Sequence, residues 1–282
     1  MTFCTKKYTL TALYLIILFT KYYLPMNLVY VTCSGTNEHT DIREMCELMQ
    51  AFSLGEIAVQ VSEKQSPAGS PRLEWVRELA AYLKENDIAI NAALHINRTW
   101  VENMCRGIVV PELQELLELK DVYDLPLFKR LQLNFKIGRD DVREDCDDTL
   151  IELQHLIKRK FILSYNQSNE RIIRQLYLEG LHFDCLYDSS FGTGVVPDSR
   201  PAPAFADILQ GYAGGIKPEN VAAELDKIAA AVKNSATLGN VYIDAQKGLE
   251  DENTHLSLEK CHQYLSAAQK WYHNHRWNSE EF

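Results

Sequence analysis

Short apolar runs alternate with amphipathic segments from residue 26 almost to the end of the chain, and this alternation constrains the fold more than any other feature. The segment Asp41–Phe52 is one example, because its apolar residues recur every third or fourth position, as on one face of a helix. Strand-like runs that alternate with such helices predict a parallel sheet whose strands are joined by helical crossovers.

Eight strands are predicted, over Leu28–Thr32, Ile57–Val61, Ile88–Leu94, Leu131–Phe135, Phe161–Tyr165, Phe183–Tyr187, Gln210–Ala213 and Val241–Asp244. Eight helical segments are predicted after them, over Asp41–Phe52, Pro71–Asn86, Pro111–Leu119, Asp147–Lys158, Asn169–Glu179, Pro203–Leu209, Pro218–Val232 and Ser257–Trp271. Eight such units fill the roughly 250 residues typical of a (β/α)8 barrel. The predicted fold is therefore α/β, a single-domain (β/α)8 TIM barrel over residues 26–282, preceded by an extension over residues 1–25. A doubly wound open sheet is the alternative, but it usually needs fewer units.

The charge balance limits the class of partner. The chain has 29 Lys and Arg residues against 39 Asp and Glu residues, a formal net charge of −10. A chain this acidic lacks the basic footprint of non-specific nucleic-acid binding, so no nucleic-acid partner is expected. A small anionic ligand stays compatible with this charge, because a local nest of backbone N–H groups binds phosphate even in an acidic protein.

The cysteines and the N-terminus point to different compartments. The seven cysteines are scattered without Cys-x-x-Cys spacing, which favours reduced thiols in a cytoplasmic protein over disulfides or a zinc site. Residues 8–20, however, form an apolar run behind Lys6 and Lys7, which resembles a signal peptide but lacks a small-x-small cleavage site. Residues 1–25 are therefore interpreted as an extension upstream of a start at Met26, as a signal or anchor, or as a structured segment. A cytoplasmic location is expected, with export or membrane anchoring as the alternative, and a membrane partner only if residues 8–24 are retained.

Polar and glycine-rich motifs follow the predicted strands. In a βα barrel the active site is built from the carboxyl ends of the strands and the loops after them. That rule selects Cys33-Ser-Gly-Thr36, Ser66-Pro-Ala-Gly-Ser-Pro-Arg72, Gln132 with Asn134, Asp188, Gly214-Gly215 and Asp244-Ala-Gln-Lys-Gly248. An acid at a strand end beside glycine turns that open a helix predicts acid/base chemistry on a phosphorylated small molecule. His273 and His275 are too few to form a metal site, so none is predicted.

Taken in order, these motifs resemble those of phosphoribosylanthranilate isomerase, the βα barrel of tryptophan biosynthesis. The most specific is Ala213-Gly-Gly-Ile-Lys-Pro-Glu-Asn-Val221, and the others are Val31–Thr36, Ser70-Pro71-Arg72, Leu131–Phe135, Leu186–Ser189 with Phe191–Gly194, and Asp244–Glu250. The resemblance runs from about residue 27 to about residue 270. Its departures are Ser34 for glycine, Asn134-Phe135 for His-Gly, Phe191 for glycine, Val195 onward for Phe-Asp-Trp, and Lys247 for a small residue.

The resemblance implies an isomerase that needs no cofactor, acts as a monomer or homodimer, and carries out an Amadori rearrangement of an N-(5-phosphoribosyl) arylamine. It implies that Asp188 is the general acid that opens the sugar ring and that Cys33 is the general base that removes the C2 proton. Both roles need tuned pKa values, a protonated Asp188 and a Cys33 thiolate. It implies substrate binding by Arg72, Gln132, Gly214, Gly215 and Gly248, with Arg72 on the anthranilate carboxylate and the glycines on the phosphate. Lys247, which departs from the family pattern, is expected to add positive charge for the phosphate.

The residues alone leave simpler roles open: a small buried Cys33, a turn-capping Asp188 and a surface Arg72. Two alternative functions also stay open, another sugar-phosphate isomerase or lyase on the same barrel, and a catalytically idle homologue that binds a phosphorylated ligand.

Overall fold

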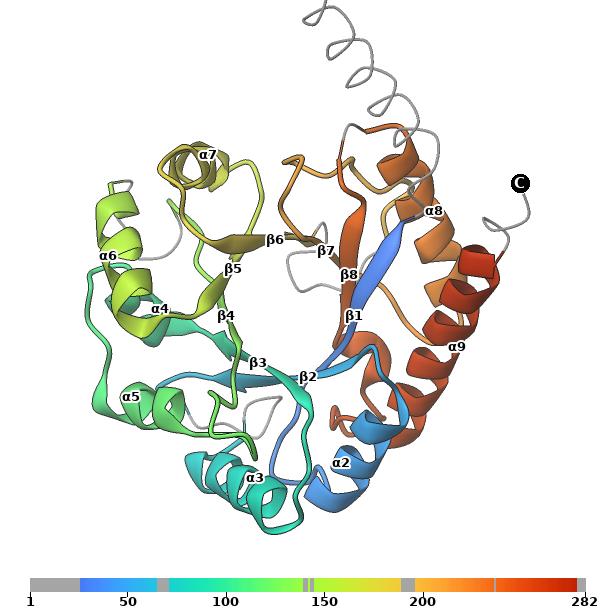
Figure 1. Cartoon of the computed structure of the whole chain (residues 1–282), viewed down its shortest axis with the longest axis horizontal. Coiled ribbons are helices and arrows are strands. Elements are labelled where there is room, and N and C mark those ends of the chain that lie inside the picture. Colours follow the sequence, from blue (N-terminus) through green and yellow to red (C-terminus); the bar gives the residue numbers. More distant parts are fainter. Residues whose placement is uncertain are drawn as a thin grey trace, which may run out of the picture.

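Eight parallel strands pair in chain order, and the first strand pairs with the last, so the sheet closes into a barrel. The computed structural model describes residues 26–64, 71–138, 142, 145–188, 196–235 and 237–277. The strands are β1 (Asn27–Ser34), β2 (Gly55–Val61), β3 (Asn91–Ile96), β4 (Arg130–Leu133), β5 (Lys160–Ser164), β6 (Phe183–Asp188), β7 (Gln210–Ala213) and β8 (Asn240–Ala245). Figure 1 shows the strands as a ring with the helices outside it, which confirms the predicted (β/α)8 fold.

The helices that cover the barrel mostly follow the predicted order. They are α2 (Ile42–Ala51), α3 (Leu73–Glu85), α4 (Arg98–Met104), α5 (Pro111–Glu118), α6 (Asp147–Ile157), α7 (Glu170–Leu178), α8 (Val221–Lys233), the short 3-10 helix η1 (Lys247–Leu249) and α9 (Leu258–Trp277). None of the described helices is long and apolar enough to cross a membrane. The predicted segments 1–25, 66–70 and 189–195 lie outside the described residues.

Two helix predictions need correction. The segment Pro203–Leu209 is not helical, because Phe205 is fixed in an aromatic cluster with Tyr177 and Phe183 and the chain there follows that contact. Helix α4 was not predicted, because its seven residues are too few to show a helical period.

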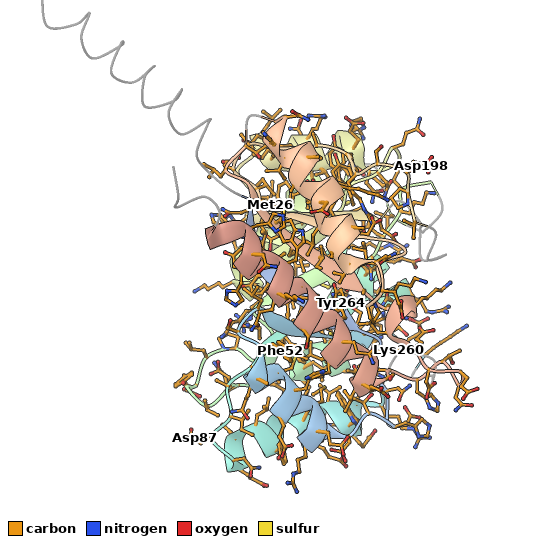
Figure 2. All side chains as sticks on the ribbon, turned by 90° about the vertical axis from the view of Figure 1, so that its right-hand side faces the viewer. Met26, Phe52, Asp87, Asp198, Lys260 and Tyr264 are labelled. Atoms are coloured by element: carbon orange, nitrogen blue, oxygen red, sulfur yellow. The ribbon has the colours of Figure 1, made fainter. Side chains whose placement is uncertain are left out.

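Side chains alternate between the inside of the barrel and the layer between barrel and helices, as successive residues of a strand must. On β1, Thr32 and Ser34 contact residues of β2 and β8 inside the barrel, whereas Val31 and Cys33 belong to the apolar core under the helices. Figure 2 looks onto the side covered by α9, where Tyr264 is completely buried. The parity of each strand therefore decides which residues reach the mouth of the barrel.

The interior below the mouth contains buried charged groups beside a small apolar cluster. The buried Arg130 donates to both oxygens of Glu56 and to Asp184, at 3.0 Å for Nη1 to Asp184 Oδ2. Its guanidinium lies between the rings of Tyr30 and Tyr242, 4.3 and 4.5 Å from their centroids. Charged groups this deeply buried are tolerated only when they are paired and hydrogen-bonded, as these are.

Candidate active site

A cavity of about 510 Å³ opens at the carboxyl ends of the strands, where the barrel rule places active sites. Its walls differ in chemistry. The side built by β6, β7, β8 and their loops carries two carboxylates, three glycines and two lysines: Asp188, Asp244, Gly214, Gly215, Gly248, Lys217 and Lys247. The side built by β2, β3 and β4 carries uncharged polar side chains: Gln60, His95, Asn97, Gln132 and Asn134.

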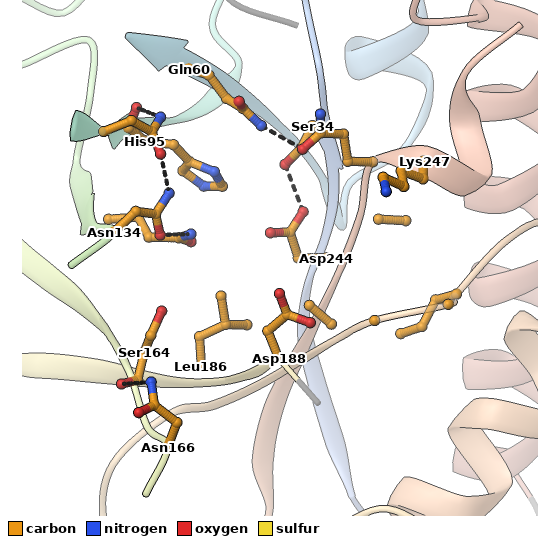
Figure 3. Close-up of a pocket in the computed structure, with 18 of the residues that line it drawn as sticks. Ser34, Gln60, His95, Asn134, Ser164, Asn166, Leu186, Asp188, Asp244 and Lys247 are labelled. Carbon is orange, nitrogen blue, oxygen red and sulfur yellow. Dashed lines mark hydrogen bonds between the residues drawn. The ribbon is translucent and has the colours of Figure 1, made fainter. Parts of the chain in front are cut away.

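Two carboxyl groups face the cavity from alternate strands. Asp188 is the last residue of β6, and Asp244 is the penultimate residue of β8. Figure 3 shows both side chains turned into the same space. They are near enough that the charge of Asp188 raises the pKa of Asp244. Asp188 was predicted from the sequence to be catalytic. The structure shows that Asp244 faces the same cavity.

The pKa of the Asp244 carboxyl lies close to neutral pH. Burial raises the pKa of this carboxyl to about 7, and the negative charges of Glu56 and Asp188 act in the same direction. The hydroxyl of Ser34 donates to Asp244 Oδ1 at 2.6 Å, which favours the ionised form and limits the rise in the pKa. Because one carboxyl is kept near its pKa beside a second one, the pair is suited to exchange protons with a ligand.

The raised pKa of Asp244 has a consequence for stability. A carboxyl that binds its proton more tightly in the folded state stabilises the fold fully below about pH 4, and that contribution is lost as the pH rises through about 7. The unmodified protein should therefore lose unfolding free energy on the order of 4 kcal/mol between these limits, and Asp244→Asn should not show this loss. Urea unfolding from pH 4 to 8.5 measures it. The exposed control Asp87→Asn should follow the unmodified protein, and equal pH dependence in Asp244→Asn would contradict the assignment.

The structure places Cys33 away from the cavity in which its predicted role would be carried out. Its side chain is 0% exposed, is absent from the cavity lining, and interacts with Cys261 of α9 in the layer between barrel and helix. Burial and this contact raise the pKa of the Cys33 thiol well above its usual range, so the thiolate is disfavoured. Ser34, one residue later, points into the cavity in its place. In this structure Cys33 is a small core residue that does not reach the cavity.

Arg72 is also displaced from its predicted place. It precedes α3 at the surface, its side chain is 67% exposed, and its charged partner is Glu38 at 3.9 Å. It does not line the cavity. The described lining residues include no arginine that could hold the anthranilate carboxylate. The neighbouring residues of its motif, Ser66–Ser70, and the turn Phe191–Gly194 lie outside the described residues.

The remaining predicted ligands do meet at one cavity: Gln132, Gly214, Gly215, Lys247 and Gly248 all line it. Two of the glycines are required by geometry. Gly215 has a φ of +69°, and a Cβ there would lie 2.6 Å from the backbone nitrogen of Val196. A Cβ on Gly248 would lie 2.3 Å from the carbonyl oxygen of Ile216. The loops after β7 and β8 therefore touch, and together they form one edge of the cavity.

A buried arginine fixes the glycine turn after β7. Arg200 donates to the carbonyl oxygens of Ala213 at 2.5 Å and Gly214 at 2.9 Å, and to Glu224 of α8 at 2.8 Å. In a trans peptide the N–H points opposite to the C=O, so the N–H groups of Gly214 and Gly215 point away from Arg200. Both glycines line the cavity, so their backbone forms part of its edge.

The motif Ile216-Lys-Pro-Glu-Asn220 closes the same turn. Asn220 accepts the backbone N–H of Lys217 at 2.9 Å and donates to the carbonyl oxygen of Gly215 at 2.9 Å. Lys217 and Lys247 flank the turn from the loops after β7 and β8. Amides with two nearby ammonium groups form a site for an anion such as a phosphate monoester.

Sequence reasoning did not assign Ser34, His95, Arg200, Lys217 or Asp244 a role. Asp244 stood at a predicted strand end, and His95 lies one residue beyond the predicted end of the third strand. The rule that barrel active sites lie at the carboxyl ends of strands could therefore have selected both residues. Arg200 follows an irregular segment that carries no motif, and only the fold shows that it contacts the glycine turn.

No family model matches this chain, and no curated protein sequence matches it. Solved structures do match it. Phosphoribosylanthranilate isomerases are among them. Monomers of the dimeric enzyme from Thermotoga maritima share 15% identity at a TM-score of 0.48, over 86% of this chain and 99% of that chain. The Thermus thermophilus enzyme shares 13% identity at a TM-score of 0.49, over 86% and 98%. The spore coat polysaccharide biosynthesis protein spsE from Bacillus subtilis shares 12% identity at a TM-score of 0.45, over 91% and 72%.

Proposed function

We propose that this protein is an acid/base isomerase that acts on a phosphorylated sugar derivative, and specifically on an N-(5-phosphoribosyl) amine in an Amadori rearrangement. The observation that carries the proposal is the pair Asp188 and Asp244 facing one cavity whose edge is a glycine turn flanked by lysines. A carboxyl pair supplies the proton transfers, and the turn supplies the phosphate anchor. The order of motifs along the chain supports the choice of reaction.

The rearrangement moves a hydrogen from C2 to C1 and proceeds by a series of proton transfers. Asp244, whose pKa lies at about 7, donates its proton to the ring oxygen as the bond from that oxygen to C1 breaks, which leaves a protonated imine at C1. Asp188 then removes the C2 proton, and the electron pair forms the C1=C2 bond of an enolamine. Asp188 then returns its proton to C1 while the C2 hydroxyl gives up its proton to Asp244, which forms the C2 ketone of the 1-amino-1-deoxy-ketose phosphate and restores both carboxyl groups. Atoms and electrons balance without an oxidant or reductant.

This assignment differs from the roles that the sequence resemblance implied. There, Asp188 was the acid and Cys33 the base. With Cys33 in the core, Asp188 takes the base role, and Asp244 becomes the acid because its burial favours the protonated form.

The test supplies the purified protein with the adducts that ribose 5-phosphate forms with 2-aminobenzoate and with 2-aminobenzamide. Both arylamines are fluorescent, so rearrangement is followed by the change in fluorescence, and the ketose product is identified by mass and NMR spectroscopy. Formation of the ketose from either adduct supports the proposal. Ribose 5-phosphate binding in calorimetry without any rearrangement would instead favour the idle, ligand-binding homologue. Absence of both binding and rearrangement would overturn the proposal entirely.

A further inference from the structure

The cavity wall opposite the carboxylates is a hydrogen-bonded chain of amides. Gln132 Nε2 donates to Asn134 Oδ1 at 2.6 Å, Asn134 Nδ2 donates to Asn97 Oδ1 at 2.9 Å, and Asn97 Nδ2 donates to the backbone carbonyl of His95 at 3.1 Å. The bonds among these side chains are drawn beside His95 in Figure 3. This series of hydrogen-bonded amides connects the ends of β3 and β4, where His95 and Gln132 are register partners.

The direction of this chain is fixed at one end. A backbone carbonyl can only accept, so Asn97 must present its NH₂ to His95 and its oxygen to Asn134. Asn134 must then donate its NH₂ to Asn97 and accept through its own oxygen. Gln132 must therefore donate its NH₂ to Asn134. Gln132 Oε1 is left as the terminal acceptor. It is buried in a side chain only 5% exposed, and it has no hydrogen-bond partner.

An unpaired buried acceptor in the wall of a cavity indicates the kind of group that pairs with it. Leaving such an acceptor unsatisfied costs free energy, so a ligand that donates a hydrogen bond there is favoured over one that does not. A carboxylate has only acceptors and would meet Gln132 Oε1 with repulsion. A carboxamide N–H or a hydroxyl would satisfy it.

Apart from Lys136, which follows β4, the rest of this wall is also uncharged. Burial and the positive charge of Arg130 beneath lower the pKa of His95 to about 3, so its imidazole stays neutral at physiological pH. Gln60 lines the same side and donates from Nε2 to Gln246 at 2.6 Å. Lys136 lies beyond the chain of amides and already has an interaction within the protein. A buried carboxylate here would lack a fixed cationic partner among these side chains, and such a charge is costly.

We propose that the amine half of the substrate is uncharged and donates a hydrogen bond, from a carboxamide or a hydroxyl, to Gln132 Oε1. This inference rests on the proposed function, since it names the group attached to the phosphorylated sugar. It makes Gln132 a specificity-determining residue. It also accounts for the place of Arg72 outside the cavity, because no carboxylate has to be held.

The two arylamine adducts are a matched pair for this inference, because they differ only in a carboxylate against a carboxamide. We expect kcat/KM for the 2-aminobenzamide adduct to exceed that for the 2-aminobenzoate adduct by at least about 10-fold. Gln132→Met keeps the length of the side chain and removes the acceptor. It should reduce the preference to less than about threefold, mainly by raising KM for the amide. Gln263→Met, an exposed position on α9, is the matched control and should keep the preference.

The outcomes separate the two proposals. Turnover of both adducts with an equal or greater kcat/KM for the carboxylate would overturn the inference and leave the proposed function standing. A carboxamide preference that survives Gln132→Met would overturn the role of Gln132. If Gln132→Met fails to fold, Gln132→Glu replaces it, and the preference for the carboxamide must then remain or increase. No turnover of either adduct, with no binding of ribose 5-phosphate, would overturn the proposed function and the inference with it.

Discussion

Asp244→Asn lowers the turnover of the preferred N-(5-phosphoribosyl) arylamine by about 10² to 10⁴-fold, the usual contribution of one general acid. The asparagine keeps the shape and can still accept from Ser34, but it has no proton to give to the ring oxygen. The loss should appear in kcat more than in KM, since Asp244 acts on the reacting atoms rather than on the phosphate. Steady-state fluorescence kinetics at pH 7 measures both constants.

Asp188→Asn is expected to cause a loss of the same order, and the double variant should lose far less than the product of the two. Both carboxyl groups serve one sequence of proton transfers, so removing either already prevents completion. Cys33→Ala is the control that separates this mechanism from the one implied by the sequence. Because Cys33 contacts Cys261 in the core, its replacement should change kcat by less than about threefold. A collapse of turnover in a folded Cys33→Ala protein would refute the carboxyl pair.

The barrel could be predicted because its evidence is repeated along the chain. Each unit shows an apolar run and an amphipathic helix, and an error in one unit does not change the total. The false helix over Pro203–Leu209 and the missed α4 left the architecture intact for this reason. The ends of the strands were less certain, as with β3, which begins and ends later than predicted.

The proposed carboxyl pair was only half predictable from the sequence. Asp188 and the glycine turn after β7 were found because strand ends and glycines carry the same meaning in any βα barrel. The prediction put the Cys33 side chain at the mouth of the barrel, whereas the structure puts the next residue of β1, Ser34, there. In β1 the polar residues Thr32 and Ser34 alternate with Val31 and Cys33, and this pattern already assigns the cysteine to the apolar face. The resemblance was followed at a position where the periodicity gave the better prediction.

Other parts of the site were not accessible from sequence because they depend on contacts between distant residues. The pKa of Asp244 depends on burial and on Glu56, which lies 188 positions earlier in the chain. The orientation of Gln132 depends on a carbonyl of β3, reached through two asparagines. The spacing of residues along the chain predicts neither the pKa of Asp244 nor the orientation of Gln132. Both became visible only when the barrel brought the strands together.

The largest effect on stability is expected at the charged interior, from Arg130→Met. The substitution leaves Glu56 and Asp184 buried, with Lys160 as the remaining cationic partner of Asp184 at 2.6 Å. Removing one member of a buried pair typically costs about 3–5 kcal/mol, because the other member keeps its desolvation penalty without compensation. The cation–π contacts with Tyr30 and Tyr242 are lost as well. Chemical denaturation at pH 7 measures the change in unfolding free energy.

Two controls assign that loss to unpaired charge rather than to altered packing. Adding Glu56→Gln to Arg130→Met should recover part of the stability, because it removes one of the stranded carboxylates. The deficit should also shrink as the pH falls toward 5, since a carboxyl deprived of its cation has a raised pKa and is stabilised by protonation. Arg43→Met, which breaks an exposed pair with Glu47 at 2.9 Å on α2, should leave the denaturation midpoint unchanged. If Arg130→Met and Arg43→Met were equally mild, the interior ion pairs would not contribute to the stability of the barrel.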